Sequence, residues 1–442
     1  MKREAALREL RRLLGPEAAG IPGGRLPACD FGGWPLSGAL AEAAPASQAQ
    51  VVALVRWAAK RAVALVPAGA RSSFWGSSAS RGAVLVDLRR MNRLLGLDEV
   101  ERSVRVEAGI ATAALEERLR RRGLAMAACP DGFGDATLGS MVANDTTAGY
   151  GMFAGPASAH LVGLRVVLGT GEVLRAGASS LYRGLPAFSR SGLPDFSGLF
   201  LASEGALGIV TEMTLRIKPL SPRRVLILRY APSRAAFEGL ARLARDLRSA
   251  RICAHWVNVS RLSPEEDETR IELEGELGPE ELERRCAWLA ARLRRLGLPG
   301  PERTENEPAR WFGGERPRRW TGVSVSAPYG NISRIQSLWL KRWRPRARRL
   351  TEGEAGLRTY FGLEGTAALL WWRRREGLER ESARFEAAAR RDLARLGLPY
   401  RLGRAWGEAA KARLDPAYRR RLRWLKRCFD PKGIMNPGVG AF

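Results

Sequence analysis

The sequence predicts an α+β protein with two domains, and three observations lead to this prediction. The chain has 442 residues, which is long for a single hydrophobic core. Strand-like and helix-like segments alternate with glycine-rich turns from Val51 to Arg216. From Arg223 onward, strand patterns alternate with longer charged helices, which is typical of an antiparallel sheet covered by helices.

The first domain is predicted element by element from its apolar periodicity and its turn residues. Leu7, Leu10 and Leu14 give the first residues one apolar helical face. In chain order we then expect a helix over 51–62, strands over 63–67, 82–88 and 103–109, a helix over 111–123, a hairpin over 161–177, and a loop, short helix and strand over 198–219. Gly123 closes its helix, and Gly169 with Gly171 forms the hairpin turn.

The second domain and the last segment follow from the same signals. Ser233 is a helix cap, and Pro279 marks a first helical position. We expect strands over 224–230, 251–262, 270–277 and 320–330, and helices over 233–249, from 279 onward and around 332–343. Residues 400–442 predict a helix followed by the turn signals DPKG and NPG.

The net charge of +27 is the most unusual feature of the composition. Such an arginine bias is as typical of a GC-rich genome as of a nucleic-acid-binding protein. We favour the genomic explanation and expect no nucleic-acid partner, because no basic motif interleaved with aromatic residues is recognisable. A basic surface still attracts an acidic partner protein or an anionic membrane surface.

Metal, disulfide and transmembrane chemistry are not predicted. The five cysteines show no paired spacing, and the chain has only two histidines. No apolar run is long enough to span a bilayer, and the charged first residues do not read as a signal peptide. These observations predict a cytoplasmic protein with reduced thiols and no metal site.

Three loops of small residues indicate a ligand with phosphate groups. They cover residues 67–82, 130–151 and 202–212, and the middle one lies in a stretch, 123–164, that contains no Lys or Arg. Small side chains let backbone N–H groups approach a ligand, and consecutive N–H groups can hold phosphate oxygens without a lysine. An extended cofactor lying along such loops explains why long cationic side chains are absent from this stretch.

Four segments carry a resemblance to a known family. They are GAVLVDLRRMNRLLGLD at 82–98, VRVEAGIATAALEERLRRRGL at 104–124, SGLFLASEGALGIVTEMTLRI at 197–217 and FDPKGIMNPG at 429–438. Together they resemble the PCMH-type FAD-binding domain of the vanillyl-alcohol oxidase and p-cresol methylhydroxylase superfamily. The resemblance implies two α+β FAD subdomains with a cap, so that 1–222 and 399–442 bind FAD and 223–398 form the substrate domain.

The resemblance also implies a set of cofactor residues. The first loop, from Ala68 to Gly76, holds the diphosphate, and the other two loops line the flavin and the adenine half. The residues so implied are Pro67, Ala68, Gly69, Ala70, Arg71, Ser72, Ser73, Gly76, Pro130, Asp131, Gly132, Thr137, Leu138, Gly139, Ser140, Asn144, Gly149, Glu204, Gly205, Gly208, Ile209, Val210 and Asn436. The family often has glycine at positions 68, 70 and 72, so Ala or Ser at positive φ there would be strained. The flavin-linking histidine of the first loop has no counterpart, which implies non-covalent FAD.

The 4-alkylphenol branch of the family implies the catalytic residues. Trp75 stands where the branch has a tyrosine over the substrate, Asp131 is the flavin-proximal acid, and Tyr150 is near another site tyrosine. Tyr400 and Arg401 resemble the pair that binds the phenolate oxygen. A permanently charged arginine beside a phenol hydroxyl stabilises the phenolate, which eases hydride transfer to flavin N5. The expected substrate is a para-substituted phenol or another aromatic alcohol.

Two other functions stay open. Segment SEGALGIVTE at 203–212 resembles the glycolate and D-lactate dehydrogenases. The histidine motif that these enzymes carry near their C-terminus is missing from the equivalent segment, RAWGEAAK at 404–411. A non-catalytic, basic nucleic-acid-binding or scaffold protein on a decayed flavin fold is the alternative of another class. For an enzyme, the +27 charge suits docking of an acidic electron-acceptor protein such as a cytochrome.

Overall fold

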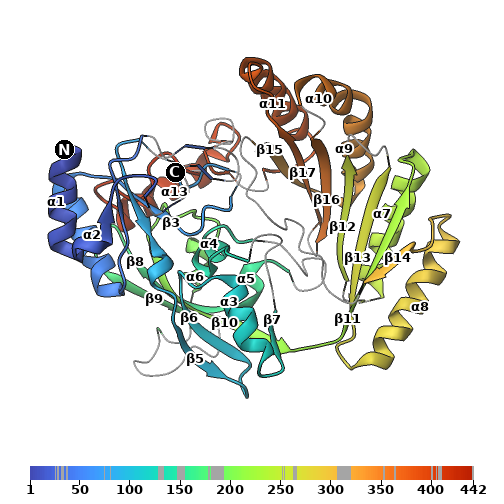
Figure 1. Ribbon diagram of the computed structural model, residues 1–442, viewed down its shortest axis with the longest axis horizontal. Helices are drawn as coiled ribbons and strands as arrows, with labels where there is room; N and C mark the ends of the chain where they lie inside the picture. Colours follow the sequence, from blue (N-terminus) through green and yellow to red (C-terminus); the bar gives the residue numbers. More distant parts are fainter. Residues whose placement is uncertain are drawn as a thin grey trace. The chain divides into compact units, whose positions relative to one another are not determined.

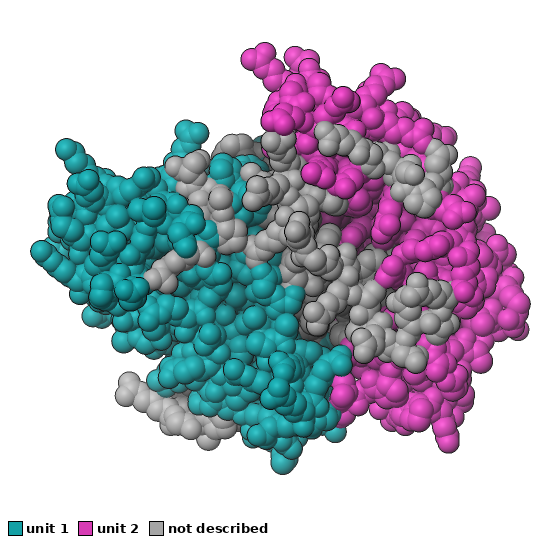
Figure 2. All heavy atoms as spheres, viewed as in Figure 1, with its two compact units in different colours: residues 1–146, 157–218, 401–442 teal, residues 147–156, 219–400 magenta. Residues whose placement is uncertain are grey.

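The computed structural model describes residues 1–442 except 25, 27–28, 31–33, 36–37, 74, 80, 128–133, 147–154, 178–179, 181–193, 251, 253, 262–265, 306–319, 352–353, 363–364, 400–401, 405, 407–410 and 441–442. Two compact units divide the chain (Figure 2). Unit 1 comprises residues 1–146, 157–218 and 401–442, and unit 2 comprises 147–156 and 219–400. Helices and strands are mixed in both units, which confirms the predicted α+β class.

The first sheet of unit 1 is mostly parallel. Its strand order is β1 (Ala19–Gly20), β2 (Ala41–Ala43), β4 (Val84–Asp87) and β3 (Leu65–Ala68), with only β1 antiparallel to its neighbour. Helices α1 (Arg3–Leu14) and α2 (Gln48–Arg61) lie beside each other and pack on this sheet (Figure 1). Helix α2 begins earlier than expected because Ser47 Oγ accepts a hydrogen bond from the backbone N–H of Gln50.

The second sheet of unit 1 is antiparallel. Its strand order is β5 (Leu94–Asp98), β6 (Ser103–Glu107), β10 (Ile209–Pro219), β8 (Leu161–Val167) and β9 (Val173–Gly177), and β7 (Leu124–Met126) also pairs with β10. The helices of this part are α3 (Thr112–Arg120), α4 (Leu138–Ala143), α5 (Ala157–His160) and α6 (Ser197–Phe200). The expected hairpin over 161–177 is confirmed, whereas the short helix near 198 precedes its loop instead of following it.

The C-terminal segment returns to the first sheet of unit 1. Met435 forms a parallel bridge with Leu65 of β3, and Leu65 donates its N–H to Ile434 O at 2.7 Å. Asn436 in turn donates its N–H to Leu65 O at 2.8 Å. Helix α13 (Pro416–Phe429) precedes this segment, with Asp415 as its cap and Pro416 at its first turn.

Unit 2 is one antiparallel sheet with helices on one face (Figure 1). The strand order is β14 (Arg303–Glu305), β11 (Arg223–Tyr230), β13 (Asp267–Glu274), β12 (Ala254–Arg261), β16 (Ala355–Gly362), β17 (Gly365–Arg373) and β15 (Trp320–Ala327). The helices are α7 (Arg234–Ser249), α8 (Pro279–Arg295), α9 (Ile332–Leu338), a π-helical turn (Trp339–Trp343), α10 (Arg344–Leu350) and α11 (Glu379–Leu393). Leu226, Ile271 and Leu273 pack against α7 and α8 in one apolar core.

Two further observations concern the elements themselves. The β16–β17 hairpin was not among the expected elements, because the sequence between its strands lacks an Asn-Gly or Asp-Gly turn signal. Among the described residues, no helix combines the length and the apolar character needed to cross a bilayer.

Candidate cofactor site and a cationic sheet face

Three turns of unit 1 correspond to the small-residue loops of the sequence. We call Ala68–Ser77 the first turn, Thr137–Asn144 the second turn and Ala202–Gly208 the third turn. The first turn follows β3, the second contains the short helix α4, and the third leads into β10. Their glycines and their hydrogen bonds show that the three turns touch one another.

The glycines of the first and third turns allow close approach. A Cβ atom placed on Gly69 would lie 2.1 Å from Thr137 Oγ1, so only glycine lets the first turn meet the second. A Cβ atom placed on Gly205 would lie 2.8 Å from Pro67 Cγ, and Gly205 also has φ +78°. The third turn therefore packs directly against the strand end from which the first turn leaves.

Glu204 connects the three turns by hydrogen bonds. Its carboxylate accepts from Ser77 Oγ at 2.6 Å and from the backbone N–H of Gly403 at 2.8 Å. Its own N–H donates to Ala143 O in the second turn at 3.0 Å. Glu204 is only 6% exposed and has a left-handed φ of 52°. Its side chain therefore holds the turns together rather than pointing to solvent.

The C-terminal segment joins the same network through Asn436. The Asn436 side-chain amide donates to Ser77 O at 2.9 Å and to Glu204 O at 2.7 Å. Its Oδ1 accepts from Arg404 at 2.8 Å, and Arg404 also donates to Pro437 O at 2.8 Å. Burial lowers the pKa of Arg404, while the charge of Glu204 raises it. No sequence pattern singles out Arg404, because one arginine among many carries no local signal.

The first turn presents backbone donors. Among the described residues, the N–H groups of Ala70, Ser72 and Ser73 have no acceptor. Arg71, between Ala70 and Ser72, has a φ of 57°. N–H groups on either side of a left-handed residue point the same way and form an anion-binding nest. The first turn can therefore hold phosphate oxygens.

Arg71 itself supports the turn instead of capturing an anion. It is 4% exposed, and its guanidinium donates to Ser78 Oγ at 3.2 Å and to Trp34 O at 3.1 Å. The left-handed conformation falls on Arg71, so the strain considered for positions 68, 70 and 72 does not arise. Because the guanidinium binds Ser78 and Trp34, the donors that the first turn offers to an anion are its backbone N–H groups.

The second turn combines structural residues with one unsatisfied acceptor. Leu138 and Gly139 donate their N–H groups to Ile110 O and Ala108 O at 3.0 and 2.7 Å, so the protein already uses these donors. The Asn144 amide donates to Ser140 O at 2.8 Å. Its Oδ1 is buried and, among the described residues, accepts no hydrogen bond. A buried acceptor without a donor is costly, and a ligand N–H would satisfy it.

The end of the third turn belongs to the protein core. A Cβ atom placed on Gly208 would lie 2.6 Å from Val166 Cγ1, so glycine is required by strand packing. Ile209 and Val210 are buried in β10, where they pair with Val167 and Val166. Ile209 and Val210, which the resemblance implies as cofactor residues, therefore have side chains in the apolar core of unit 1.

Several predicted residues lie outside the described part of the chain. They are Pro130, Asp131, Gly132, Gly149, Tyr150, Tyr400 and Arg401. Trp75 is described and is 7% exposed. Its N–H donates to Ser73 Oγ at 3.3 Å, and its carbonyl accepts from the backbone N–H of Arg404 at 2.9 Å. The Trp75 backbone therefore ties the first turn to the C-terminal segment.

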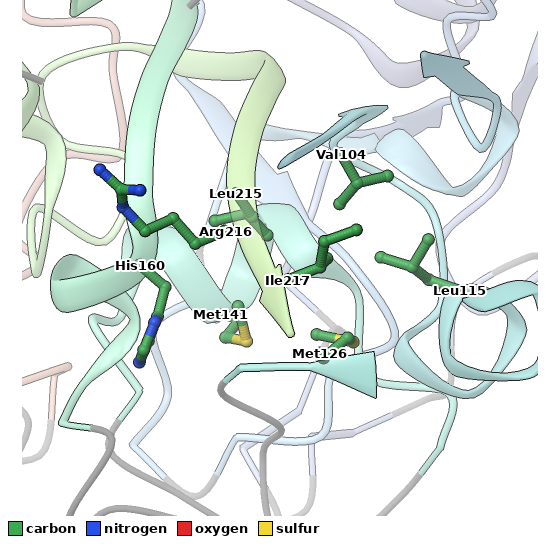
Figure 3. Close-up of a pocket in the computed structure, with 8 residues that line it drawn as sticks. All are labelled: Val104, Leu115, Met126, Met141, His160, Leu215, Arg216 and Ile217. Atoms are coloured by element: carbon green, nitrogen blue, oxygen red, sulfur yellow. The ribbon is translucent and has the colours of Figure 1, made fainter. Parts of the chain in front are cut away.

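A small cavity of unit 1 lies between its second sheet and the neighbouring helices (Figure 3). Apolar side chains including Val104, Leu115 and Ile217 line it, and His160 and Arg216 lie at its edge. Its volume of about 10 Å³ is near the minimum for one water molecule. Met141 of the second turn also lines this cavity, which is too small for a substrate.

Unit 2 has a group of charged side chains on the sheet face opposite its helices. Successive residues of a strand point to opposite faces of the sheet. Ile271 of β13 faces the helices, so Glu268 and Arg270 lie on the opposite face. In the strand register, Glu268 lies opposite Arg229 of β11 on one side and opposite Val259 of β12 on the other. Val259 in turn lies opposite Arg358 of β16. These residues form one row across four strands.

We call Arg229, Arg261, Arg270 and Arg358 the arginine group. Glu268 accepts from Arg270 at 2.6 Å and lies 3.4 Å from Arg229. Arg358 is 5% exposed. Burial lowers the pKa of Arg261; Glu268 raises it, and the other three arginines lower it further. Three of these arginines (Arg229, Arg261 and Arg270) act on the Glu268 carboxylate, and Arg358 lies next to Val259 in the same row, so arginines outnumber this carboxylate in the row.

The comparisons with known proteins agree on a flavin cofactor. Residues 39–177 match the family described as the FAD binding domain. The D-2-hydroxyglutarate dehydrogenase of Xanthomonas citri pv. viticola is 34% identical over 191 residues, which cover 43% of this chain and 39% of that protein. The D-lactate dehydrogenase of Anaerostipes hadrus is 31% identical over 183 residues, which cover 41% and 37%. This chain thus matches about two fifths of the length of these curated relatives.

Solved structures cover nearly the whole chain. p-Cresol methylhydroxylase with substrate bound has a TM-score of 0.80 at 16% identity, covering 99% of this chain and 96% of that one. The 4-ethylphenol oxidase of Gulosibacter chungangensis has a TM-score of 0.77 at 19% identity, covering 98% and 96%. The chain therefore contains an FAD-binding domain and has the fold of PCMH-type flavoproteins, as its resemblance implied.

Proposed function

We propose that this chain is an FAD-dependent oxidoreductase in which unit 1 holds the cofactor and unit 2 contributes to substrate binding. The FAD-binding-domain match over 39–177 includes the first and second turns. The observation that carries the proposal is the contact between three turns of small residues, fixed by Glu204 and Asn436. Such a junction offers backbone donors to an extended nucleotide without bulky side chains.

The residues of the turns fit FAD. The N–H groups of Ala70, Ser72 and Ser73 suit its diphosphate, which needs donors and little steric bulk. Asn144 Oδ1 suits an N–H donor of the cofactor, because it is buried and unsatisfied among the described residues. We propose non-covalent attachment, since the sequence offers no histidine in the first turn.

Bound FAD supplies a two-electron acceptor for a hydride from the substrate. The chain's own task is then to orient the substrate and to stabilise the charge that develops on it. For a para-substituted phenol or aromatic alcohol, we assign stabilisation of the phenolate oxygen to Tyr400 and Arg401 and a position near the reacting carbon to Asp131. We place Trp75 and Tyr150 around the substrate ring, on the resemblance to the 4-alkylphenol branch.

A 2-hydroxy acid is the second candidate substrate, and the arginine group favours it. Guanidinium groups bind carboxylates through paired charge-assisted hydrogen bonds. The group lies on the sheet face of unit 2 that its helices leave uncovered. Two relatives act on 2-hydroxy acids according to their names, D-2-hydroxyglutarate dehydrogenase and D-lactate dehydrogenase.

Anaerobic loss of the visible flavin absorption distinguishes the two substrates. The FAD-loaded protein is mixed with 4-ethylphenol and, separately, with D-2-hydroxyglutarate and D-lactate. A phenol-oxidising enzyme bleaches only with the phenol, and a hydroxy-acid enzyme only with an acid. A protein that binds no FAD, or that bleaches with no alcohol or phenol, contradicts the proposed function.

A variant of the arginine group sharpens this test. Arg261→Gln removes one charge from the cationic face, and Arg380→Gln removes an exposed arginine of α11 as the matched control. If a carboxylate binds the group, Arg261→Gln raises the KM for the acid about tenfold, the equivalent of one charged hydrogen bond. The KM for a neutral alcohol stays unchanged, and Arg380→Gln changes neither.

The remaining predictions concern the surroundings of the enzyme. We propose a small-molecule substrate and an acidic electron-acceptor protein, such as a cytochrome, for which the +27 charge is the support. Reduction of such an acceptor should slow as ionic strength rises, because salt screens long-range attraction. A cytoplasmic location stays a prediction.

A further inference from the structure

Helix α13 differs in its charge pattern from arginine-rich helices such as α3, α7 and α8. Residues 416–429 contain five arginines and one lysine but no acidic residue. In those three helices, arginines pair with glutamates one turn away. Examples are Arg121–Glu117 in α3, Arg234–Glu238 in α7 and Arg285–Glu281 in α8. A general arginine bias explains such mixed helices, but it does not explain a helix that holds six cations and no acid.

The exposed side of α13 places a tryptophan among arginines. Arg420, Arg421, Trp424 and Arg427 are all exposed, and Trp424 lies four and three residues after the first two and three before Arg427. Residues with this spacing share one helix face. Trp424 is 52% exposed, although a tryptophan buries most of its surface in an ordinary protein fold. Among the described residues, none of these three arginines forms an ion pair within the chain.

The opposite side of α13 fixes the helix to unit 1. Lys426 Nζ donates to Ala206 O at 2.5 Å, to Asp430 at 2.6 Å and to Met435 O at 2.6 Å. The Phe429 ring stacks on Phe200 with centroids 5.8 Å apart. Lys426 and Phe429 thus hold the helix in place, while Arg420, Arg421, Arg427 and Trp424 lie on its exposed side.

A second basic stretch of the chain lacks the aromatic residue. Residues 339–350 of unit 2 also contain six cations and no acid. Both tryptophans of that stretch, Trp339 and Trp343, are fully buried. Arg346 and Arg349 are exposed there without an exposed aromatic neighbour. This stretch offers charge alone and is a matched control for α13.

We propose that the exposed face of α13 is a docking surface for an anionic lipid membrane. Tryptophan prefers the headgroup level of a bilayer, where its ring is partly apolar and its N–H is hydrated. Arg420, Arg421 and Arg427 around it complement lipid phosphates, and each cation near an anionic surface strengthens binding about fivefold. A specific protein partner needs a larger apolar centre than one half-exposed tryptophan.

Vesicle sedimentation of the FAD-loaded full chain tests this proposal. One vesicle preparation contains phosphatidylcholine alone, and the other contains phosphatidylcholine with phosphatidylglycerol. We expect binding to the anionic vesicles only, with an affinity that falls as salt is added. Equal binding to both preparations, or binding to neither, overturns the proposal.

Variants locate the binding surface. Arg420→Gln/Arg421→Gln/Arg427→Gln should weaken vesicle binding about a hundredfold, following from three cations at about fivefold each. Trp424→Ala should weaken it several-fold at unchanged charge. Arg346→Gln/Arg349→Gln should leave it nearly unchanged. Equal losses in the two helices would mean that overall charge alone is responsible, which contradicts a site on α13.

Two controls complete the experiment. The circular dichroism spectrum and the thermal midpoint of each variant must match the parent, which is expected because the substituted side chains are exposed. Duplex DNA at the same salt concentration tests the competing use of a cationic helix. Tighter binding to the duplex than to anionic vesicles would assign α13 to nucleic acid and overturn the membrane proposal.

Discussion

The turns of unit 1 and the charged sheet face of unit 2 are built in opposite ways. The turns consist of small residues and backbone donors, with one buried glutamate, Glu204, connecting them. The sheet face of unit 2 carries long charged side chains, the arginine group and Glu268, which project from regular strands. A backbone site recognises what most nucleotides share, whereas a side-chain site distinguishes one substrate from another.

This difference also concerns tolerance to mutation. In the turns, the close approaches at Gly69 and Gly205 depend on the absence of a side chain, so even a methyl group at Gly69 is excluded. On the sheet face, an exposed side chain such as Arg261 can change while its strand stays in place. We therefore expect large losses of stability and of FAD from changes in the turns, and changes of selectivity from the sheet face.

The largest effect is expected for Glu204→Ala. The change leaves the Ser77 hydroxyl and the Gly403 N–H buried without their acceptor. Two lost hydrogen bonds to a charged group lower the free energy of unfolding by about 3–5 kcal/mol. Urea unfolding measures this loss, and FAD titration measures the accompanying loss of cofactor affinity.

Glu212→Ala is the control for this change. Glu212 lies on β10, just after the third turn, and within the described part of the chain its carboxylate pairs with Arg165 at 3.2 Å and Arg105 at 3.7 Å. Its removal should lower the free energy of unfolding by about 1 kcal/mol or less and leave FAD binding intact. Similar losses for both glutamates would show that Glu204 does not connect the turns.

The next largest effect is expected for Gly69→Ala. The added methyl group would meet Thr137 Oγ1 at 2.1 Å and would push the first and second turns apart. Overpacking of this kind lowers the free energy of unfolding by about 2 kcal/mol. If the binding free energy of FAD falls by the same amount, the Kd for FAD rises more than tenfold. Thermal unfolding and FAD titration measure the two quantities.

A second substitution should restore part of the loss. Thr137→Ala removes both Oγ1 and Cγ2, leaving only the Thr137 Cβ at 3.2 Å from the new methyl group. The double variant should therefore bind FAD better than Gly69→Ala alone. Gly20→Ala is the control, because nothing lies within 4 Å of its added Cβ atom. Absence of rescue would mean that the turns do not meet through this contact.

The same contrast explains what could be predicted from the sequence. The small-residue loops and the α+β class were evident, because glycine, serine and alanine runs between strands leave a local pattern. The helix cap at Ser233 follows from a rule that acts within one turn of chain, although the same rule was not applied at Ser47, where α2 begins earlier than expected. Local chemistry was therefore sufficient for most elements of unit 1.

Features that depend on distant residues were not predictable. The arginine group requires the register of four strands, in which Arg358 lies in the same row as Glu268 although they are far apart in sequence. The Glu204 carboxylate likewise accepts hydrogen bonds from Ser77 and Gly403, which are distant from it in the sequence. No local pattern reports such partners, because loop closure brings them together only in the folded chain.

The smallest effect is expected for Glu268→Gln, and it depends on pH. Burial raises the pKa of Glu268, but the hydrogen bond from Arg270 and the charges of Arg270, Arg261 and Arg229 outweigh burial and lower it below its usual value. The ionised carboxylate therefore adds stability that is complete above the ordinary glutamate pKa and is lost as pH falls through the lowered one. At about pH 7 the variant should lose about 1 kcal/mol, a modest value for a pair near the surface. The difference in unfolding free energy from the parent should shrink towards about pH 3, because the glutamine cannot titrate. A difference that stays constant with pH would mean that the arginines do not stabilise the charge of Glu268.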